Sequence, residues 1–237
     1  MFSWFSRKKS NNLIVDIHSH LIPGIDDGVK DHAEALVILQ EFERLGFKKI
    51  ITTPHVYPDY YPNTKKDILT AYNQINQALT EQKLKIQLEV AAEYFIDGSF
   101  LDLMNRPEEV LSFGQNRYVL VETPFMNKPL IFDEVIFKMK SLGFVPVLAQ
   151  PERYSYLRDD LSWLKKLREQ GVHLQITTSS LIGAYGKEAQ KSAKKLMRER
   201  MVDFVGSDVH REKQLTTVMR SYKEDFSGLN LRNNELV

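Results

Sequence analysis

Seven short apolar runs recur along the chain, separated by longer stretches of mixed polarity. The runs are three to five residues long and rich in valine, isoleucine and leucine, which is typical of buried strands. They cover residues 13–17, 49–53, 86–90, 118–121, 145–149, 173–177 and 203–205. We predict a strand at each of them.

Helical periodicity appears between these runs. Apolar residues recur three and four positions apart within residues 35–45 and 132–139, which predicts helices with one buried face. Gly46, Gly143 and Gly171 each stand between a helical stretch and the next strand, where a helix C-terminal cap belongs. Strands that alternate with helices indicate a parallel α/β sheet covered by helices. Seven repeats favour a closed or nearly closed barrel over an open doubly wound sheet.

One domain accounts for the whole chain. Its 237 residues are 43% hydrophobic, which suffices for one sizeable core, and they contain no repeat, low-complexity tract or linker. We place the barrel at residues 13–226, between an N-terminal tail of residues 1–12 and a C-terminal tail of residues 227–237. Residues 212–226 have an amphipathic pattern that predicts a helix packed on the barrel or on a partner.

Charge and cysteine content exclude several classes of function. The 32 basic and 31 acidic residues leave no basic field, so we expect no nucleic-acid partner. The chain has no cysteine, which excludes disulfides, zinc-thiolate sites and a cysteine-nucleophile phosphatase. Residues 1–9 combine aromatic and basic side chains but lack the apolar stretch and cleavage site of a signal peptide. We expect a cytoplasmic protein without a transmembrane segment, whose start either is a simple tail or touches the inner face of a membrane.

Metal-ligating residue types follow the first predicted strand. His18 and His20 project to the same side because side chains alternate in an extended segment. Asp26 and Asp27 follow in a turn bracketed by glycines, and Asp26 is the weaker ligand candidate because it could simply cap the turn.

The same residue types recur at the ends of other predicted strands, where a barrel of this class places its active site. They are His55, Glu93, Glu122, Asp208 and His210. Any one of them alone is better explained as a structural residue, but four of the six histidines stand at strand ends, and their coincidence with carboxylates predicts a metal centre. Histidines and carboxylates without cysteine suit manganese, iron, zinc or magnesium. The other two histidines, His32 and His173, we interpret as structural.

Arg153 follows the fifth predicted strand. A guanidinium held near a metal cluster suits bidentate binding of phosphate oxygens, and a salt bridge within the loop is the alternative. Glu152 and Tyr154 are interpreted as residues that orient this loop. Three tyrosines after the second strand either line a groove for an aromatic substrate or form a rigid packed loop; they are Tyr57, Tyr60 and Tyr61.

The order of these motifs resembles the PHP (polymerase and histidinol phosphatase) superfamily. Between residues 16 and 210 the chain reads, in order, HSH, PGIDDG, TPH, AEY, ETP, QPERY, SSLIGAYG and GSDVH. The likeness extends to the capsule or exopolysaccharide biosynthesis protein-tyrosine phosphatases of bacteria. It implies a distorted TIM-like (β/α)7 PHP barrel with two or three divalent ions, commonly manganese, with iron, zinc or magnesium as alternatives. The implied metal ligands are His18, His20, Asp27, His55, Glu93, Glu122, Asp208 and His210, with Glu122 between two ions.

The resemblance also implies a reaction and a partner. A metal-activated water would hydrolyse phosphotyrosine on the C-terminal tail of a phosphorylated tyrosine kinase of polysaccharide export. Arg153 would bind the phosphate, and Asp208 or His210 could supply a proton if not fully committed to metal. The resemblance leaves open whether the protein forms an oligomer.

One residue departs from the family pattern. Relatives generally read AHPERY where this chain has Gln150, a neutral amide that binds transition metals poorly and is at most a weak ligand through its oxygen. Because of Gln150, the protein could be a catalytically weakened metalloprotein that binds phosphotyrosine or the kinase. A separate alternative keeps the metal cluster but changes the substrate to a small phosphate ester such as histidinol phosphate, or to a nucleic-acid end. Some relatives also carry an arginine-proline stretch after the last motif. This chain has none, and Arg211, the nearest basic residue, is a weak candidate for phosphate contact.

Overall fold

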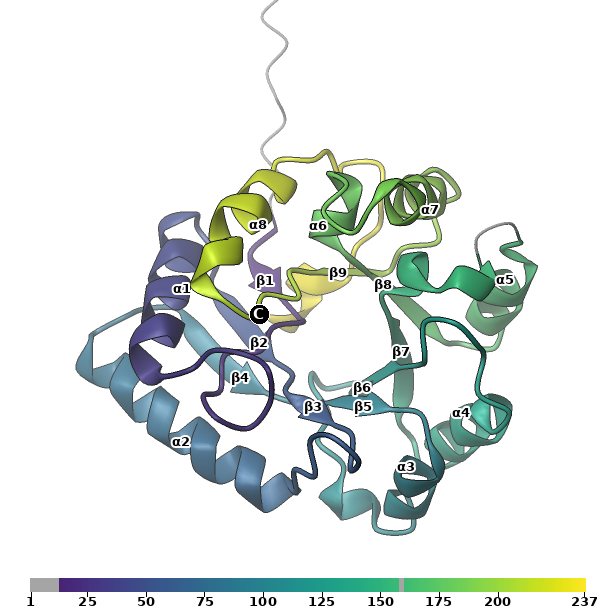
Figure 1. Cartoon of the computed structure of the whole chain (residues 1–237), viewed down its shortest axis with the longest axis horizontal. Helices are drawn as coiled ribbons and strands as arrows, with labels where there is room; N and C mark the ends of the chain where they lie inside the picture. The colour runs from purple at the N-terminus through teal and green to yellow at the C-terminus, as the bar shows by residue number, and fades with distance from the viewer. Residues whose placement is uncertain (1–12, 158–159) are drawn as a thin grey trace, which may run out of the picture.

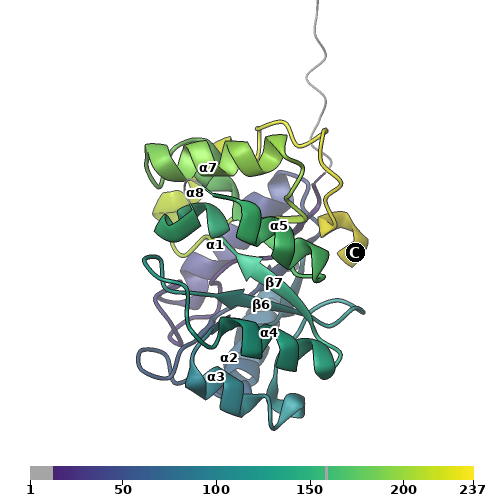
Figure 2. The same cartoon turned by 90° about the vertical axis from the view of Figure 1, so that its right-hand side faces the viewer.

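The strands form a ring and the helices lie outside it, as Figure 1 shows for the computed structural model of the chain. The structure describes residues 13–157 and 160–237, so the predicted N-terminal tail lies outside the described residues. In the side view of Figure 2, α4 (Phe132–Ser141) and α5 (Ser162–Glu169) lie on the outer side of the strands. This arrangement confirms the α/β barrel expected from the alternating pattern.

The described residues contain nine short strands, all paired in parallel. They are β1 (Val15–Asp16), β2 (Lys49–Thr52), β3 (His55–Val56), β4 (Gln87–Val90), β5 (Glu93–Phe95), β6 (Tyr118–Glu122), β7 (Val145–Ala149), β8 (His173–Thr177) and β9 (Phe204–Gly206). One sheet has the order β1-β2-β4 and the other the order β3-β5-β6-β7-β8-β9. All seven predicted strands are present.

Two of the seven barrel strands are broken, and these breaks distort the barrel from a regular (β/α)7 arrangement. Thr53 and Pro54 separate β2 from β3, and Ala91 and Ala92 separate β4 from β5. Pro54 has no N–H to continue the ladder. Sequence patterning missed β3 and β5 because each has only two or three residues, but both belong to the candidate site. Backbone hydrogen bonds close the ring between the first and last strands, from Asp208 N to His18 O (2.8 Å) and from His20 N to Val209 O (2.9 Å).

Helices follow most strands. They are α1 (His32–Arg44), α2 (Lys65–Glu81), α3 (Gly98–Leu103), α4, α5, α6 (Thr178–Leu181), α7 (Lys187–Arg198) and α8 (Leu215–Ser221), with 3-10 turns at Pro107–Glu109, Pro151–Arg153, Ser155–Leu157, Glu212–Gln214 and Asn233–Leu236. The apolar faces predicted for α1 and α4 are buried, except that Leu45, the C-cap residue of α1, is 39% exposed. The predicted helix at 212–226 is confirmed in part, as α8 and the turn before it. Within the described ranges, no helix has both the length and the apolar character needed to cross a membrane.

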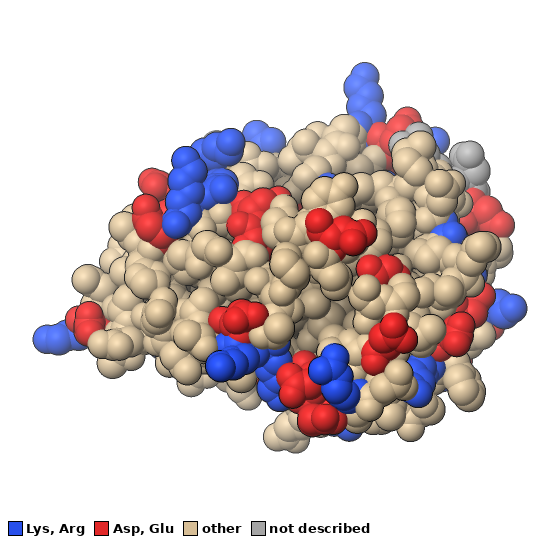
Figure 3. Space-filling model, turned by 60° about the horizontal axis from the view of Figure 1, so that its bottom comes forward, with Lys and Arg blue, Asp and Glu red and all other residues tan. Residues whose placement is uncertain are grey.

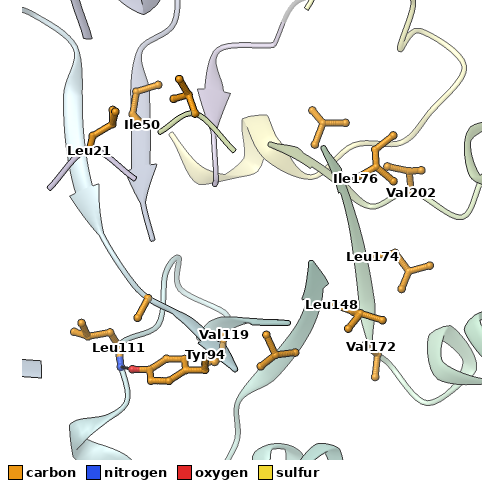
Figure 4. Packing of buried hydrophobic residues seen from close by; sticks show 14 of the residues in the cluster. Leu21, Ile50, Tyr94, Leu111, Val119, Leu148, Val172, Leu174, Ile176 and Val202 are labelled. Carbon is orange, nitrogen blue, oxygen red and sulfur yellow. Dashed lines mark hydrogen bonds between the residues drawn. The ribbon is translucent and has the colours of Figure 1, made fainter. Parts of the chain in front are cut away.

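The core has two parts because strand side chains alternate between the two faces of the barrel wall. The larger part lies between strands and helices and includes Leu148, Leu174 and Ile176, drawn in Figure 4. Tyr94 belongs to it, and its hydroxyl accepts a hydrogen bond from Leu111 N (2.7 Å), as the dashed line in Figure 4 marks. The smaller part includes Val147, the neighbour of Leu148 that faces the other way.

The segment predicted as a C-terminal tail packs against the barrel. Asn233 is fully buried and its amide donates to Val15 O (3.0 Å) and Val205 O (2.8 Å), on β1 and β9. Leu236 joins the smaller core cluster. This segment therefore ties the first strand to the last. On the face shown in Figure 3, basic and acidic side chains are interspersed, in keeping with the near-neutral net charge.

An ion-paired carboxylate stabilises β8 and β9. Asp203 accepts hydrogen bonds from Arg168 Nη2 (2.9 Å) and Leu174 N (3.0 Å), and it lies 3.4 Å from Nδ1 of His173, a contact that agrees with the interpretation of this histidine as structural. Burial alone would raise the pKa of Asp203, but the His173, Arg168 and Leu174 contacts hold it below its usual range.

We expect Asp203→Asn to lower the free energy of unfolding at pH 7 by about 1–3 kcal/mol, because the ion pair and its hydrogen bonds are lost. A depressed folded-state pKa contributes stability above the unfolded value of about 4, and this contribution disappears as pH falls through the folded value. Urea unfolding of the metal-free protein at pH 7 and at steps below pH 5 measures this. The control, Asp133→Asn, removes an exposed partner of Lys128 and should change little. Equal stability of wild type and Asp203→Asn at pH 7 would refute the expectation.

Candidate metal centre

All eight predicted metal ligands come together at the carboxyl ends of the strands. Their ligand atoms form three overlapping groups, within each of which the atoms lie within 4.8 Å of one another. The groups are His20, Asp27, His55 and His210; His18, His20 and Asp208; and His55, Glu93 and Glu122. Since His20 and His55 each belong to two groups, the three form one continuous cluster.

Glu93 has the central place in this cluster. It is fully buried, and its Oε2 lies 3.1 Å from His18 Nε2, 3.5 Å from His20 Nε2 and 3.3 Å from His55 Nδ1. Glu122, which the family resemblance places between two ions, approaches His55 Nδ1 at 3.2 Å. The geometry therefore favours Glu93 over Glu122 as the carboxylate shared between neighbouring positions.

Three histidines are oriented by acceptors on their Nδ1 atoms. His18 Nδ1 lies 2.9 Å from Gln175 Oε1, His20 Nδ1 lies 2.8 Å from Asp26 Oδ2, and His210 Nδ1 lies 2.9 Å from the carbonyl oxygen of Asp208. Each acceptor favours the tautomer with the proton on Nδ1, which leaves Nε2 unprotonated and available to a metal. Asp26 thus orients a ligand in addition to capping its turn, where its other oxygen accepts from Gly28 N (2.9 Å).

Opposite charges dominate the electrostatics of the cluster. Burial would lower the pKa of His18, but the carboxylates of Glu93 and Asp208 raise it to about 10. Burial also opposes protonation of His55, and Glu122 and Glu93 raise its pKa to about 10. The carboxylates of Glu93, Glu122 and Asp208 thus attract positive charge into a buried site. Divalent ions would provide that charge in place of the protons, since metals bind neutral imidazoles and ionised carboxylates.

The donor set fits divalent ions. Besides the eight converging ligand atoms, Oε1 of Glu93 is buried and has no hydrogen-bond partner among residues 13–157 and 160–237. A buried acceptor of this kind is costly unless a cation or donor satisfies it. Imidazole and carboxylate ligands suit manganese, iron or zinc.

Arg153 lies beside the cluster. Its Nη1 donates to Asp208 Oδ2 (3.2 Å) and to the side-chain oxygen of Gln150. Gln150 is buried, with a left-handed backbone (φ 44°), and Asp208 has φ 54°. Such conformations in non-glycine residues are strained and cluster at functional sites. The side-chain oxygen of Gln150, expected from the sequence to be at most a weak metal ligand, accepts a hydrogen bond from Arg153 in the structure.

The neighbours of Arg153 orient its loop. The carboxylate of Glu152 is buried and accepts from Thr177 N (2.9 Å) and Ser180 Oγ (2.8 Å). Tyr154 donates to Ala149 O (2.7 Å) and accepts from Thr123 N (3.1 Å). These contacts attach the loop to the neighbouring strands, as expected from its position.

A cleft of about 620 Å³ opens above the cluster. Its lining combines ligand candidates and Arg153 with aromatic side chains, namely Tyr57, Tyr60, Tyr61, Phe95, Phe125 and Tyr185. The tyrosine loop is also packed: Tyr57 stacks on Phe95 with centroids 4.0 Å apart, and Tyr61 stacks on His55 at 5.4 Å. The two interpretations of this loop are therefore compatible.

Sequence reasoning missed several residues of this site. Phe95 follows Tyr94 within β5, and Phe125 follows the ETP motif directly. Tyr185 lies in the SSLIGAYG motif. This motif contributed to the family resemblance, but the sequence suggested no function for Tyr185 itself. Gln175 lies on β8 between the apolar residues Leu174 and Ile176, and this polar residue within a buried strand was the available signal.

Comparisons with known proteins agree with the family resemblance. A family model described as capsular polysaccharide synthesis, CpsB/CapC, matches residues 14–225. The tyrosine-protein phosphatase YwqE of Bacillus subtilis (strain 168) is 32% identical over 201 residues, 84% of this chain and 78% of the relative. The tyrosine-protein phosphatase CpsB of Streptococcus pneumoniae is 25% identical over 202 residues, 83% of each chain.

A solved structure agrees as well. It comes from work on YwqE of Bacillus subtilis and CpsB of Streptococcus pneumoniae, described as unique metal-dependent tyrosine phosphatases. It superposes with a TM-score of 0.78 at 28% identity, covering 90% of this chain and 89% of the other. The match confirms the barrel over nearly the whole chain.

Proposed function

This chain belongs to the capsular polysaccharide synthesis family CpsB/CapC, and on that premise we propose that it is a metal-dependent protein-tyrosine phosphatase. The observation that carries the proposal is the convergence of eight ligand side chains beside Arg153 at the base of an aromatic cleft. The cluster suits a phosphate and the aromatic walls suit the phenyl ring that carries it.

The eight clustered residues would hold two or three divalent ions, with Glu93 shared between them. Bound ions would supply an activated water as nucleophile and positive charge for the phosphoryl oxygens. Manganese is the ion we expect, with iron, zinc or magnesium as alternatives. Asp26 and Gln175 would keep His20 and His18 oriented for this purpose.

The remaining residues would bind and orient the substrate. Arg153 would bind two phosphoryl oxygens through its planar fork of N–H groups. The leaving phenol has a pKa of about 10, so it requires less help from a general acid than an alkoxide would. The proton for this oxygen would come from water, or from His210 or Asp208 where that residue is not committed to a metal; both residues line the cleft.

The family points to a partner and a compartment. The substrate we propose is the phosphorylated C-terminal tail of a tyrosine kinase that acts in polysaccharide export. We further propose a cytoplasmic enzyme that acts near the inner face of the membrane. The capsular polysaccharide description of the family supports both proposals.

The test is hydrolysis of a phosphotyrosine peptide by protein purified without chelator, with added Mn²⁺ and with EDTA. Turnover that EDTA abolishes and Mn²⁺ restores would support the function. Histidinol phosphate, a phosphoserine peptide and a 5′-phosphorylated oligonucleotide serve as competing substrates. A preference for one of these over the phosphotyrosine peptide would overturn the protein-tyrosine assignment while leaving the metal centre standing.

Gln150 keeps a second function open, namely a weakened metalloprotein that binds phosphotyrosine without fast turnover. We expect Gln150→His to raise metal affinity by roughly tenfold, because an imidazole replaces an amide next to the cluster. Metal titration and phosphotyrosine turnover of wild type and variant measure this. A large gain in turnover together with affinity would show that wild type is impaired. Unchanged affinity would show that residue 150 lies outside the ligand sphere and acts through Arg153.

A further inference from the structure

Two aromatic side chains contact the guanidinium of Arg153. Its Cζ lies 4.5 Å from the ring centroid of Phe125 and 4.2 Å from that of Tyr185. The rings come from separate parts of the chain, the loop after β6 and the turn before α7. Arginine stacks well on aromatic faces because its charge is delocalised over a plane and weakly hydrated.

The hydrogen bonds of Arg153 involve one end of the guanidinium. Nη1 donates to Gln150 and to Asp208. In the part of the chain that the structure describes, the N–H groups of Nε and Nη2 donate to no protein acceptor. These two groups form the edge that binds an oxyanion in bidentate fashion.

Both rings are themselves held. The carbonyl oxygen of Phe125 accepts from Ser155 N (2.7 Å) and Ser155 Oγ (3.0 Å), which fixes its loop beside that of Arg153. The hydroxyl of Tyr185 lies 3.4 Å from Asp208 Oδ2. Two rings attached in this way restrict a long side chain that would otherwise sample many rotamers.

We propose that Phe125 and Tyr185 are positioning residues for phosphate recognition: they hold the guanidinium of Arg153 so that its Nε and Nη2 edge faces the cleft. This inference rests on the proposed function for its biological meaning, but it concerns binding of the phosphate group alone. It separates the two rings from the tyrosine loop after β3, whose rings contact no guanidinium within the described residues and are suited to the phenyl ring of the substrate.

Affinity of the metal-loaded protein for inorganic phosphate, measured by titration calorimetry, tests the proposal. Phosphate has no ring, so a direct contact between Phe125 or Tyr185 and a substrate ring cannot affect this measurement. We expect Phe125→Leu and Tyr185→Leu each to weaken phosphate binding by roughly three- to tenfold. Tyr185→Phe keeps the ring and should recover most of the loss. Phe137→Leu, at an exposed aromatic on α4 outside the cleft, is the matched control and should leave the affinity unchanged.

A double-mutant cycle shows whether the rings act through Arg153. In an Arg153→Met background, Phe125→Leu and Tyr185→Leu should have no further effect on phosphate affinity. The proposal would be overturned if Phe125→Leu or Tyr185→Leu still weakened phosphate binding in this background. It would also be overturned if both single variants bound phosphate as tightly as wild type, or if wild type bound no phosphate. Phe125 is 39% exposed, so its variant keeps the test available if Tyr185→Leu fails to fold. Phosphate binding that follows the expected pattern in a protein without phosphotyrosine turnover would overturn the proposed function alone.

Discussion

Replacing Glu93 with glutamine should abolish metal-dependent turnover, with a loss of more than about a hundredfold. The substitution keeps the size of the side chain but removes the negative charge that lies within 3.5 Å of His18, His20 and His55. Because Glu93 lies beside His18 and His20 of one ligand group as well as beside His55 of its own group, its loss should affect more than one ion. Metal content after gel filtration and turnover at saturating Mn²⁺ measure both effects.

Glu89→Gln is the matched control for this experiment. Glu89 precedes Glu93 by four residues and is partly buried on β4, where its carboxylate pairs with Lys49 at 3.2 Å. We expect normal metal content and turnover in this variant. Addition of Mn²⁺ should raise the melting temperature of wild type and of Glu89→Gln but not that of Glu93→Gln. A Glu93→Gln protein that retains its metals and turns over within tenfold of wild type would contradict the central role of this carboxylate.

Arg153→Met should lower kcat/KM for a phosphotyrosine peptide by about 10²–10³, or about 2.7–4 kcal/mol of transition-state stabilisation. The methionine preserves much of the apolar stem but removes the charge and all N–H donors. Arg153→Lys keeps the charge without the planar fork, so it should recover only a small part of the loss. Steady-state kinetics with the metal-loaded variants measures both.

Arg211 provides the comparison for this prediction. It also lines the cleft, and its Nη1 lies 3.5 Å from Glu34 Oε2. We expect Arg211→Met to reduce kcat/KM by less than about tenfold, since its charge is already partnered at the surface. A larger loss in Arg211→Met than in Arg153→Met would show that the phosphate-binding arginine had been assigned to the wrong residue.

The strand and helix pattern was predictable because it depends on local periodicity. Each barrel strand is a short apolar run, and α1 and α4 carry apolar residues at helical spacing. Two-residue alternation also placed His18 and His20 on one side of the first strand, which the structure confirms by their 3.3 Å Nε2 to Nε2 separation. The breaks that create β3 and β5 were not predictable, since the segments are shorter than any periodic signal.

The convergence of the ligand candidates followed from topology. In a parallel barrel all carboxyl ends of strands meet at one end, so residues that follow strands are brought together however far apart they lie in the chain. His18 and Asp208, separated by most of the sequence, approach to 3.4 Å for this reason. Residue type and order along the chain were sufficient to predict this cluster.

By itself, the sequence determined the barrel, the ligand types and the family, because these depend on periodicity, strand order and motif spacing. Only the tertiary structure decided which side chains orient and surround the metal ligands and Arg153. Gln175 contacts His18 across 157 residues, and Tyr185 and Phe125 reach Arg153 from two separate loops. Such contacts depend on loop conformation and side-chain direction, and neither leaves a periodic trace in the chain. The physical reason is that a hydrogen bond or stacking contact requires placement within a few tenths of an ångström, which only the packed barrel provides.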